Sequence, residues 1–182
     1  FIIILVIIAL VFAIRAFAKT DAGKHFFGKI ALKAPLFGKL TTKSASSMMA
    51  RTMSTLLGAG VPLIEAVDIV SGVMSNIYFK EAMEDAKEEI TIGMPLSRPL
   101  QESRLFPPMV YQMIRIGEES GNTEEMLDKL ADYYDEEVEM SVQSLMAAME
   151  PMIIIVMAAI VCVILAAIYG PVIQMNSELS NM

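Results

Sequence analysis

Residues 152–169 read MIIIVMAAIVCVILAAIY, a run without a single charged side chain. At a rise of 1.5 Å per residue a helix of this length covers roughly 27 Å, close to the hydrocarbon thickness of a bilayer, about 30 Å. The run therefore predicts a transmembrane helix over residues 151–170. The segment before it has apolar side chains every three or four positions, at Leu127, Leu130, Tyr134, Val138, Val142, Leu145 and Met149. This spacing predicts one amphipathic helix that begins near residue 122 and continues unbroken into the transmembrane helix.

The composition of the whole chain agrees with membrane insertion. Apolar residues make up 55% of the 182 residues, and the mean hydropathy is +0.55, higher than in an ordinary soluble domain. The net charge of −7 argues against nucleic acid as a partner. The one cysteine, Cys162, lies in the predicted transmembrane helix, so we expect no disulfide framework and interpret it as an apolar filler.

A second apolar run, FIIILVIIALVFAI, occupies residues 1–14. As a helix it covers about 21 Å, less than a full span, and we interpret it as a truncated transmembrane helix. The alternative is a secretory signal, because Ala16, Phe17 and Ala18 resemble a cleavage site. No basic region precedes the run, which disfavours that alternative.

The charges around the two apolar runs predict their orientation. Residues 15–43 form a basic juxtamembrane segment whose one acidic residue is Asp21, whereas residues 171–182 contain no Lys or Arg. By the positive-inside rule, the central region is expected in the cytoplasm and the short C-terminal tail on the outer side of the membrane. The chain is therefore predicted to be a multi-pass membrane protein.

The central region, residues 44–150, is divided by glycines and prolines in the positions that end and begin helices. Gly60 is followed by Pro62, Pro107 opens a later segment, and Gly121 ends it. We expect helices near residues 44–57, 62–74, 77–91, 95–102, 107–120 and from 123 onward. The short connections between them predict an all-α fold, a six-helix antiparallel bundle whose last helix is continuous with the C-terminal transmembrane helix.

The third of these helices has a clear apolar face, formed by Phe79, Ala82, Met83, Ala86 and Ile90. Charged residues cover its other side. Glu84 has Lys80 one turn before it and Lys87 one turn after it, so two surface ion pairs are predicted.

No motif in the sequence points to catalysis. A phosphate-binding loop, a zinc-binding H-E-x-x-H and a G-x-S-x-G nucleophile motif are all missing, so we expect no catalytic residue, cofactor or metal. We interpret His25, the only histidine, as a surface residue. The acidic run at residues 133–137 could attract a divalent cation, but helical spacing aims its carboxylates in different directions, so we favour a solvated surface.

Two groups of acidic residues are candidates for docking a partner. Glu118 and Glu119 lie between Gly117 and Gly121 at a helix corner, which is interpreted either as a plain helix end or as a docking corner. The second group, Asp132, Asp135 and Glu139, forms part of the acidic side of the last helix and suits a basic partner. Pro151, after Glu150, removes one backbone hydrogen bond where that helix enters the membrane and is a candidate kink.

Five short motifs follow one another along the chain: AGVPL at 59–63, FPP at 106–108, QMIRIGEESG at 112–121, LADYY at 130–134 and EP at 150–151. In this order they resemble the type II secretion system F domain, as found in the C-terminal half of the inner-membrane platform proteins of type IV pili and type II secretion. Thr123 departs from the pattern, because the family commonly has leucine there.

The resemblance implies a multi-pass protein of the bacterial inner membrane without enzymatic activity. Its six-helix cytoplasmic domain lies between two transmembrane helices, and the C-terminal tail expected on the outer side is then in the periplasm. It also implies a homo-oligomeric platform under which a hexameric assembly ATPase docks, and which passes motion to pilin or pseudopilin subunits in the lipid bilayer. Family members usually carry two such domains, so we interpret the missing first half as a truncation.

Two other classes of protein remain as alternatives from the residues alone. A membrane-anchored helical signalling or receptor module would also use a helix that continues into the membrane, but only about a dozen residues follow that helix to sense a signal outside. A membrane-embedded enzyme or transporter is disfavoured, because such proteins usually carry charged side chains inside the membrane and neither apolar run has one. The sequence does not distinguish a pilus from a secretion system.

Overall fold

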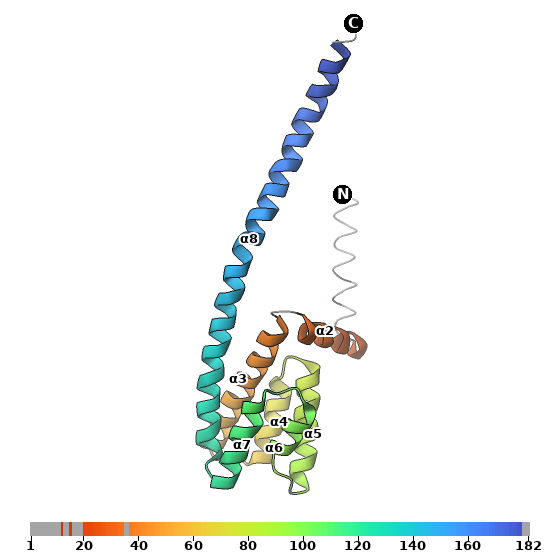
Figure 1. Ribbon diagram of the computed structural model, residues 1–182. Coiled ribbons are helices and arrows are strands. Elements are labelled where there is room, and N and C mark those ends of the chain that lie inside the picture. Colours follow the sequence, from red (N-terminus) through yellow and green to blue (C-terminus); the bar gives the residue numbers. More distant parts are fainter. Residues whose placement is uncertain (1–11, 13–14, 16–19, 35–36, 180–182) are drawn as a thin grey trace. The chain divides into compact units, whose positions relative to one another are not determined.

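The computed structural model describes Phe12, Arg15 and residues 20–34 and 37–179, and every regular element within these residues is a helix (Figure 1). The prediction of an all-α chain is therefore confirmed for this part of the sequence. The first predicted transmembrane helix, residues 1–14, lies outside the described residues except for Phe12.

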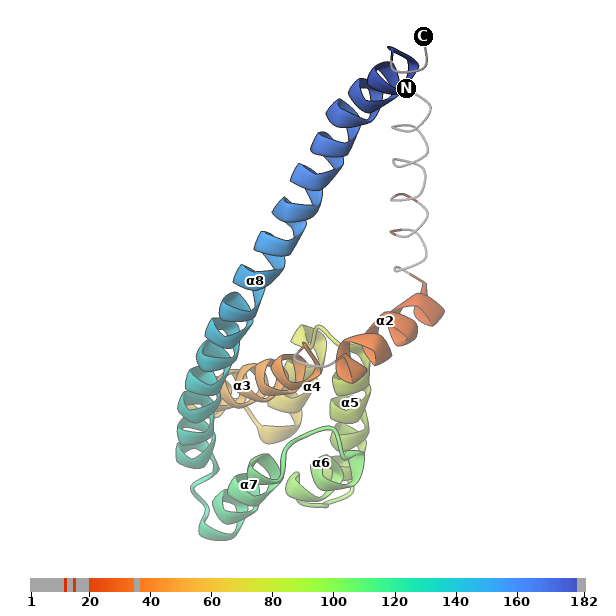
Figure 2. The same cartoon turned by 45° about the horizontal axis from the view of Figure 1, so that its top comes forward.

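Seven helices follow one another in the described ranges: α2 (Asp21–Lys33), α3 (Phe37–Gly58), α4 (Leu63–Val73), α5 (Ile77–Thr91), α6 (Ser97–Ser103), α7 (Pro108–Ser120) and α8 (Thr123–Leu179). The chain divides into two compact units, and the boundary falls inside α8, between Ser141 and Val142. We call them the helical unit and the C-terminal unit. In the helical unit α4 packs against both α3 and α5, and α6 packs between α5 and α7 (Figure 2).

The core of the helical unit takes buried side chains from α3 to α7 and from the first turns of α8. At its centre Phe79 of α5 is fully buried, and its ring meets that of Phe106 edge-on with centroids 5.1 Å apart. Leu127 and Leu130 of α8 are fully buried in the same core. The first half of α8 is therefore held by apolar burial, the main favourable term in folding.

Helix α5 has the bounds expected from its sequence pattern. Its N-terminus is capped by the Asn76 side chain, which accepts a hydrogen bond of 3.0 Å from the backbone N–H of Tyr78. The five predicted apolar positions, Phe79, Ala82, Met83, Ala86 and Ile90, are all buried, which confirms that face.

The charged side of α5 differs in one respect from the prediction. Lys80 and Glu84 lie 3.6 Å apart and form the expected ion pair. Lys87 instead bonds Asp68 of α4, with Nζ 2.7 Å from Oδ1, so the predicted pair with Glu84 is wrong. The spacing rules used for the prediction consider residues of one helix only, so they cannot identify a partner on the neighbouring helix.

The basic segment 15–43 contains more helix than expected. Helix α2 lies wholly within it, and α3 begins at Phe37 rather than near residue 44. The side chain of Thr20 begins α2 by accepting a hydrogen bond of 3.2 Å from the N–H of Gly23. Asn76 then donates to the backbone oxygen of Gly28 at 3.1 Å, which ties α2 to the start of α5. The lysines that repeat along this segment interrupt the apolar periodicity from which a helix is recognised in sequence.

The predicted helix ends are found close to their expected places. Gly60 and Gly121 have positive φ angles of 81° and 72°, in the left-handed region that glycine adopts at little cost. Pro62 and Pro107 immediately precede the first residues of α4 and α7. Pro151 lies within α8, which continues as one helix to Leu179, so residues 171–179 of the predicted tail are helical.

In the C-terminal unit, α8 carries the one helical stretch among the described residues that is long and apolar enough to cross a membrane. An eighteen-residue window of it has a mean hydropathy of 3.1, and none of that window is buried within the chain. Side chains from Met152 to Tyr169 are exposed all round the helix. A helix that is apolar on every side needs an apolar surrounding, which a bilayer provides.

Candidate functional site

A group of charged side chains lies between α3 and the first half of α8. Arg51 of α3 contacts three aspartates of α8: its Nη1 lies 3.0 Å from Asp128, and its Nη2 lies 2.6 Å from Asp132 and 2.7 Å from Asp135. The three aspartates are four and three residues apart, so they follow one face of α8. One guanidinium thus serves three carboxylates.

Two further α3 side chains extend this contact along the helix pair. Ser47, one turn before Arg51, donates a hydrogen bond to Asp135. Lys43, a further turn back, lies 2.5 Å from Glu137 and 3.0 Å from the hydroxyl of Ser141. We call this row the Arg51 seam, which consists of Lys43, Ser47, Arg51, Asp128, Asp132, Asp135, Glu137 and Ser141.

The Arg51 seam is partly exposed, and its hydrogen bonds favour the charged forms of Arg51 and Asp135. Hydrogen bonds with Asp132 and Asp135 raise the pKa of Arg51, and hydrogen bonds from Ser47 and Arg51 lower the pKa of Asp135. The Arg51 side chain is 41% exposed, so each ion pair contributes less than about 1 kcal/mol of stability. The seam therefore sets the alignment of α3 with α8 more than it stabilises the core.

Three of the five residues that were predicted to dock a partner lie in or next to the Arg51 seam. Asp132 and Asp135 are brought together by Arg51. Glu139 is exposed one turn beyond Asp135 on the same helix, and it too has an interaction partner. Because three aspartates share one arginine, the seam remains net negative.

The other two predicted docking residues, at the end of α7, have different surroundings. The carboxylate of Glu118 accepts hydrogen bonds from the backbone N–H of Leu96 at 2.5 Å, the N–H of Ser97 at 3.3 Å and the Ser97 hydroxyl at 2.7 Å. Glu118 therefore caps the start of α6 from a neighbouring helix. Glu119 is exposed and forms no hydrogen bond or ion pair with any residue that the structure describes.

Replacing Glu118 with alanine is expected to lower the free energy of unfolding of the helical unit by about 1–2 kcal/mol, because buried donors at Leu96 and Ser97 lose their acceptor. Urea unfolding in mild detergent, followed by circular dichroism, measures this change. The matched control is Glu119→Ala, which removes the same carboxylate next door and should stay within about 0.5 kcal/mol of wild type. Equal losses in both variants would contradict the capping role of Glu118.

The corner between α7 and α8 is closed by backbone contacts. The N–H of Asn122 bonds the carbonyl oxygen of Gly117 at 2.9 Å, around the left-handed Gly121. Gly117 is buried, and a Cβ atom placed there would lie 2.8 Å from the Cα of Thr123. The helix end predicted at Gly121 is thus present, and Gly117 is needed for the close approach of α8.

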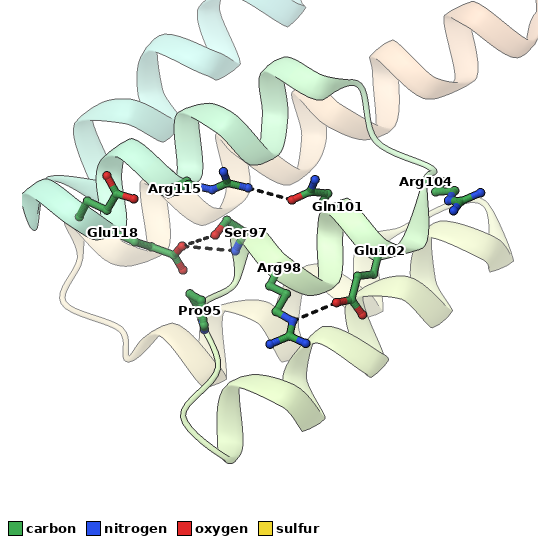
Figure 3. A pocket seen from close by; sticks show the side chains of 9 residues that line it. Pro95, Ser97, Arg98, Gln101, Glu102, Arg104, Arg115 and Glu118 are labelled. Carbon is green, nitrogen blue, oxygen red and sulfur yellow. Dashed lines mark hydrogen bonds and ion pairs between the residues drawn. The ribbon is translucent and has the colours of Figure 1, made fainter.

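A pocket of about 820 Å³ lies beside Glu118, between α6 and α7 (Figure 3). Its charged lining residues are Arg98, Glu102, Arg104, Arg115, Glu118 and Glu119. Arg98 bonds Glu102 at 2.9 Å, and Arg115 bonds the side-chain oxygen of Gln101 at 2.8 Å. Sequence reasoning missed this group, because its arginines are scattered over two helices and a loop.

No metal site is formed by the described residues, in which no three His, Cys, Asp or Glu side chains are grouped to hold an ion. His25 of α2 lies 3.2 Å from Glu81 of α5 and meets the ring of Tyr78 edge-on. These contacts join α2 to α5.

Comparison with known proteins places the chain in a family. The family described as "Type II secretion system (T2SS), protein F" matches residues 49–171, more than half of the chain. The chain belongs to this protein F family. The resemblance expected from the five motifs is therefore confirmed. The matched region contains Arg51, Glu118, the pocket and the apolar part of α8, whereas α2, Lys43 and Ser47 precede it.

Relatives in the protein F family come from both pili and secretion systems. The chain is 45% identical over 146 residues to the type IV pilus assembly protein PilC of Pseudomonas aeruginosa, covering 80% of this chain and 39% of the relative. It is 40% identical over 178 residues to PilC of Thermus thermophilus, covering 97% and 44%. It is 31% identical over 166 residues to the type II secretion system protein F of Aeromonas hydrophila, covering 91% and 43%. The chain thus spans about two fifths of the length of these curated relatives.

Proposed function

We propose that this chain is part of a non-enzymatic inner-membrane platform protein of a type IV pilus or type II secretion machine. In this role it couples a cytoplasmic assembly ATPase to the assembly of pilin or pseudopilin subunits. The observation that carries the proposal is the family match over residues 49–171, which includes most of the helical unit and the apolar stretch of α8. The names of the relatives, pilus assembly protein and secretion system protein, agree with it.

The proposed topology has two transmembrane helices around a cytoplasmic domain. Helices α3 to α7 and the first half of α8 form a six-helix antiparallel bundle in the cytoplasm, and the chain ends in the periplasm. The basic residues of segment 15–43 support this orientation, since lysine and arginine are retained on the cytoplasmic side of the membrane.

Helix α8 is the part suited to transmit motion. Buried leucines, Leu127 and Leu130, fix its first turns in the core of the helical unit, and its apolar stretch belongs to the same helix. We propose that a displacement of the bundle is passed towards the membrane along this helix.

We further propose that the platform is a homo-oligomer and that a hexameric ATPase docks on its acidic surface. The predicted docking residues Glu118, Glu119, Asp132, Asp135 and Glu139 belong to the family-matched region. The net negative charge of the Arg51 seam supports a basic partner, because complementary charge speeds and orients association. Within this set, Glu119 and Glu139 are the residues to vary, since Glu118, Asp132 and Asp135 make the structural contacts described above.

The proposal is tested by purifying the full-length protein from its native membrane in gentle detergent and identifying co-purifying proteins by mass spectrometry. Recovery of a secretion ATPase together with pilin-like proteins is expected. A preparation of equal stability that contains neither would overturn the proposal and favour a membrane-anchored signalling module.

The double variant Glu119→Lys/Glu139→Lys is expected to lower recovery of the ATPase by about fivefold or more, through charge repulsion with a basic partner. Pilin recovery and the melting temperature should change little. The control Asp85→Lys/Glu88→Lys makes the same change in charge on exposed positions of α5 and should retain the ATPase. Equal ATPase recovery from both variants would move the docking surface away from α7 and α8.

A further inference from the structure

The pocket between α6 and α7 contains three arginines and three glutamates, yet its charges are not all paired with one another. Arg98 and Glu102 form an ion pair one turn apart on α6. The carboxylate of Glu118 is occupied by backbone and side-chain donors at the start of the same helix. The guanidinium groups of Arg104 and Arg115 are left without a carboxylate among the described residues.

These two guanidinium groups have unused hydrogen-bonding capacity. Arg115 bonds the neutral amide of Gln101, and the Arg104 guanidinium forms no hydrogen bond or ion pair within the part of the chain that the structure describes. Arginine stays protonated in proteins and presents five N–H donors in a planar fork that matches a carboxylate. Both side chains are exposed, so a partner can reach them.

The backbone gives no reason for an arginine at position 104. Arg104 ends α6 with φ 55° and ψ 16°, and it is the one residue other than glycine with a positive φ angle in the described ranges. A glycine or asparagine would adopt this conformation at lower cost. The reason for an arginine here is therefore sought in its side chain, which lines the pocket.

The arrangement in space decides between kinds of anion. In Figure 3, Arg115 and Arg104 lie on opposite sides of Gln101 and do not converge on one point. A single phosphate therefore cannot bridge them, whereas an extended chain with spaced carboxylates can. The volume of about 820 Å³ is within the range of ligand-binding pockets.

We propose that this pocket binds an extended acidic peptide segment of a partner protein, with Arg104 and Arg115 each receiving a carboxylate. The segment lies along α6 and α7 and uses the bidentate geometry that arginine offers. This inference goes beyond the proposed function, because it rests on the pocket and does not depend on which machine contains the chain.

Peptide binding to the full chain in phosphatidylcholine nanodiscs tests the proposal. The probe is a fluorescein-labelled hexaglutamate peptide, followed by fluorescence anisotropy at low salt, and hexaglutamine with the same label is the neutral control. The whole chain carries a net charge of −7, so its long-range electrostatic field repels the acidic probe. Binding of this probe therefore reports a local site and not a general attraction to the protein surface. Saturable binding of hexaglutamate but not of hexaglutamine is expected.

Variants then assign the binding to the two guanidinium groups. Arg104→Gln and Arg115→Gln are each expected to weaken binding about tenfold, because each loses one charge-assisted contact. Arg104→Lys keeps the charge but loses the fork, so it should fall between wild type and Arg104→Gln. The matched control Arg98→Gln/Glu102→Gln removes an ion pair of the same pocket without changing its net charge, and binding should stay within about twofold.

Melting temperatures show which variants remain folded. If Arg115→Gln is unfolded, the test rests on Arg104→Gln, because the Arg104 side chain is exposed and its substitution is not expected to disturb the fold. Binding by Arg104→Gln that equals wild type would overturn the proposal. Displacement of the peptide by pyrophosphate at equal or lower concentration would also overturn it, because the pocket would then be a site for small anions.

Discussion

Phe79→Ala is expected to lower the free energy of unfolding of the helical unit by about 3–5 kcal/mol, the range for removal of a fully buried aromatic ring. The Phe79 side chain is 0% exposed and meets Phe106 edge-on, so truncation removes both a ring contact and the volume that fills the core. Helix α5 packs against α2, α4 and α6, and these helices cannot all move to close the cavity at once.

Urea unfolding of the full chain in mild detergent measures the loss, because the detergent keeps the apolar part of α8 helical while the helical unit unfolds. The control is Phe37→Ala, which removes the same ring from a side chain that is 59% exposed at the start of α3. That variant should lose less than about 1 kcal/mol. If Phe79→Ala lowered the free energy of unfolding by as little as Phe37→Ala does, α5 would not be packed in the core.

Gly117→Ala and Gly72→Ala are expected to change stability in opposite directions. At Gly117 the added Cβ would lie 2.8 Å from the backbone of Thr123, so α7 and α8 must separate, at a cost of about 2–3 kcal/mol. At Gly72, inside α4, no atom lies within 4 Å of the added Cβ. Alanine there should raise the free energy of unfolding by about 0.5–1 kcal/mol, as at an open helical position.

The same urea unfolding experiment compares the two variants. Both changes add one methyl group to a helical glycine, so helix propensity cancels and the difference reports the space around each site. A gain in stability for Gly117→Ala would mean that the corner between α7 and α8 is looser than the Gly117–Thr123 approach requires.

The fold of the helical unit was largely predictable where local signals agree. In α5 the capping residue Asn76 and the buried face from Phe79 to Ile90 coincide, and the helix has the expected bounds. Gly121 was recognised as a helix end for the same reason, since only a few residue types adopt its conformation readily. Helix α2 was missed because its lysines weaken the apolar periodicity on which recognition depends.

The contacts of the candidate site were not predictable from local pattern. Arg51 and Asp128 are 77 residues apart, and no rule for one helix brings them together. Lys43, Ser47 and Arg51 are four residues apart, and the aspartates on α8 are four and three residues apart, so each set follows one helix face. These two faces were the available signal. Glu118 was recognised as notable, but its capping of α6 depends on the packing of α6 against α7.

The Arg51 seam also makes the two helices unequally tolerant of mutation. Substitution of any one of Asp128, Asp132 or Asp135 leaves Arg51 with two carboxylate partners, so the contact between α3 and α8 is kept. Loss of Arg51 leaves three neighbouring carboxylates repelling one another, and α3 carries no second guanidinium to replace it. Substitutions among the three aspartates of α8 are therefore tolerated better than substitution of Arg51, because the three aspartates share that one guanidinium.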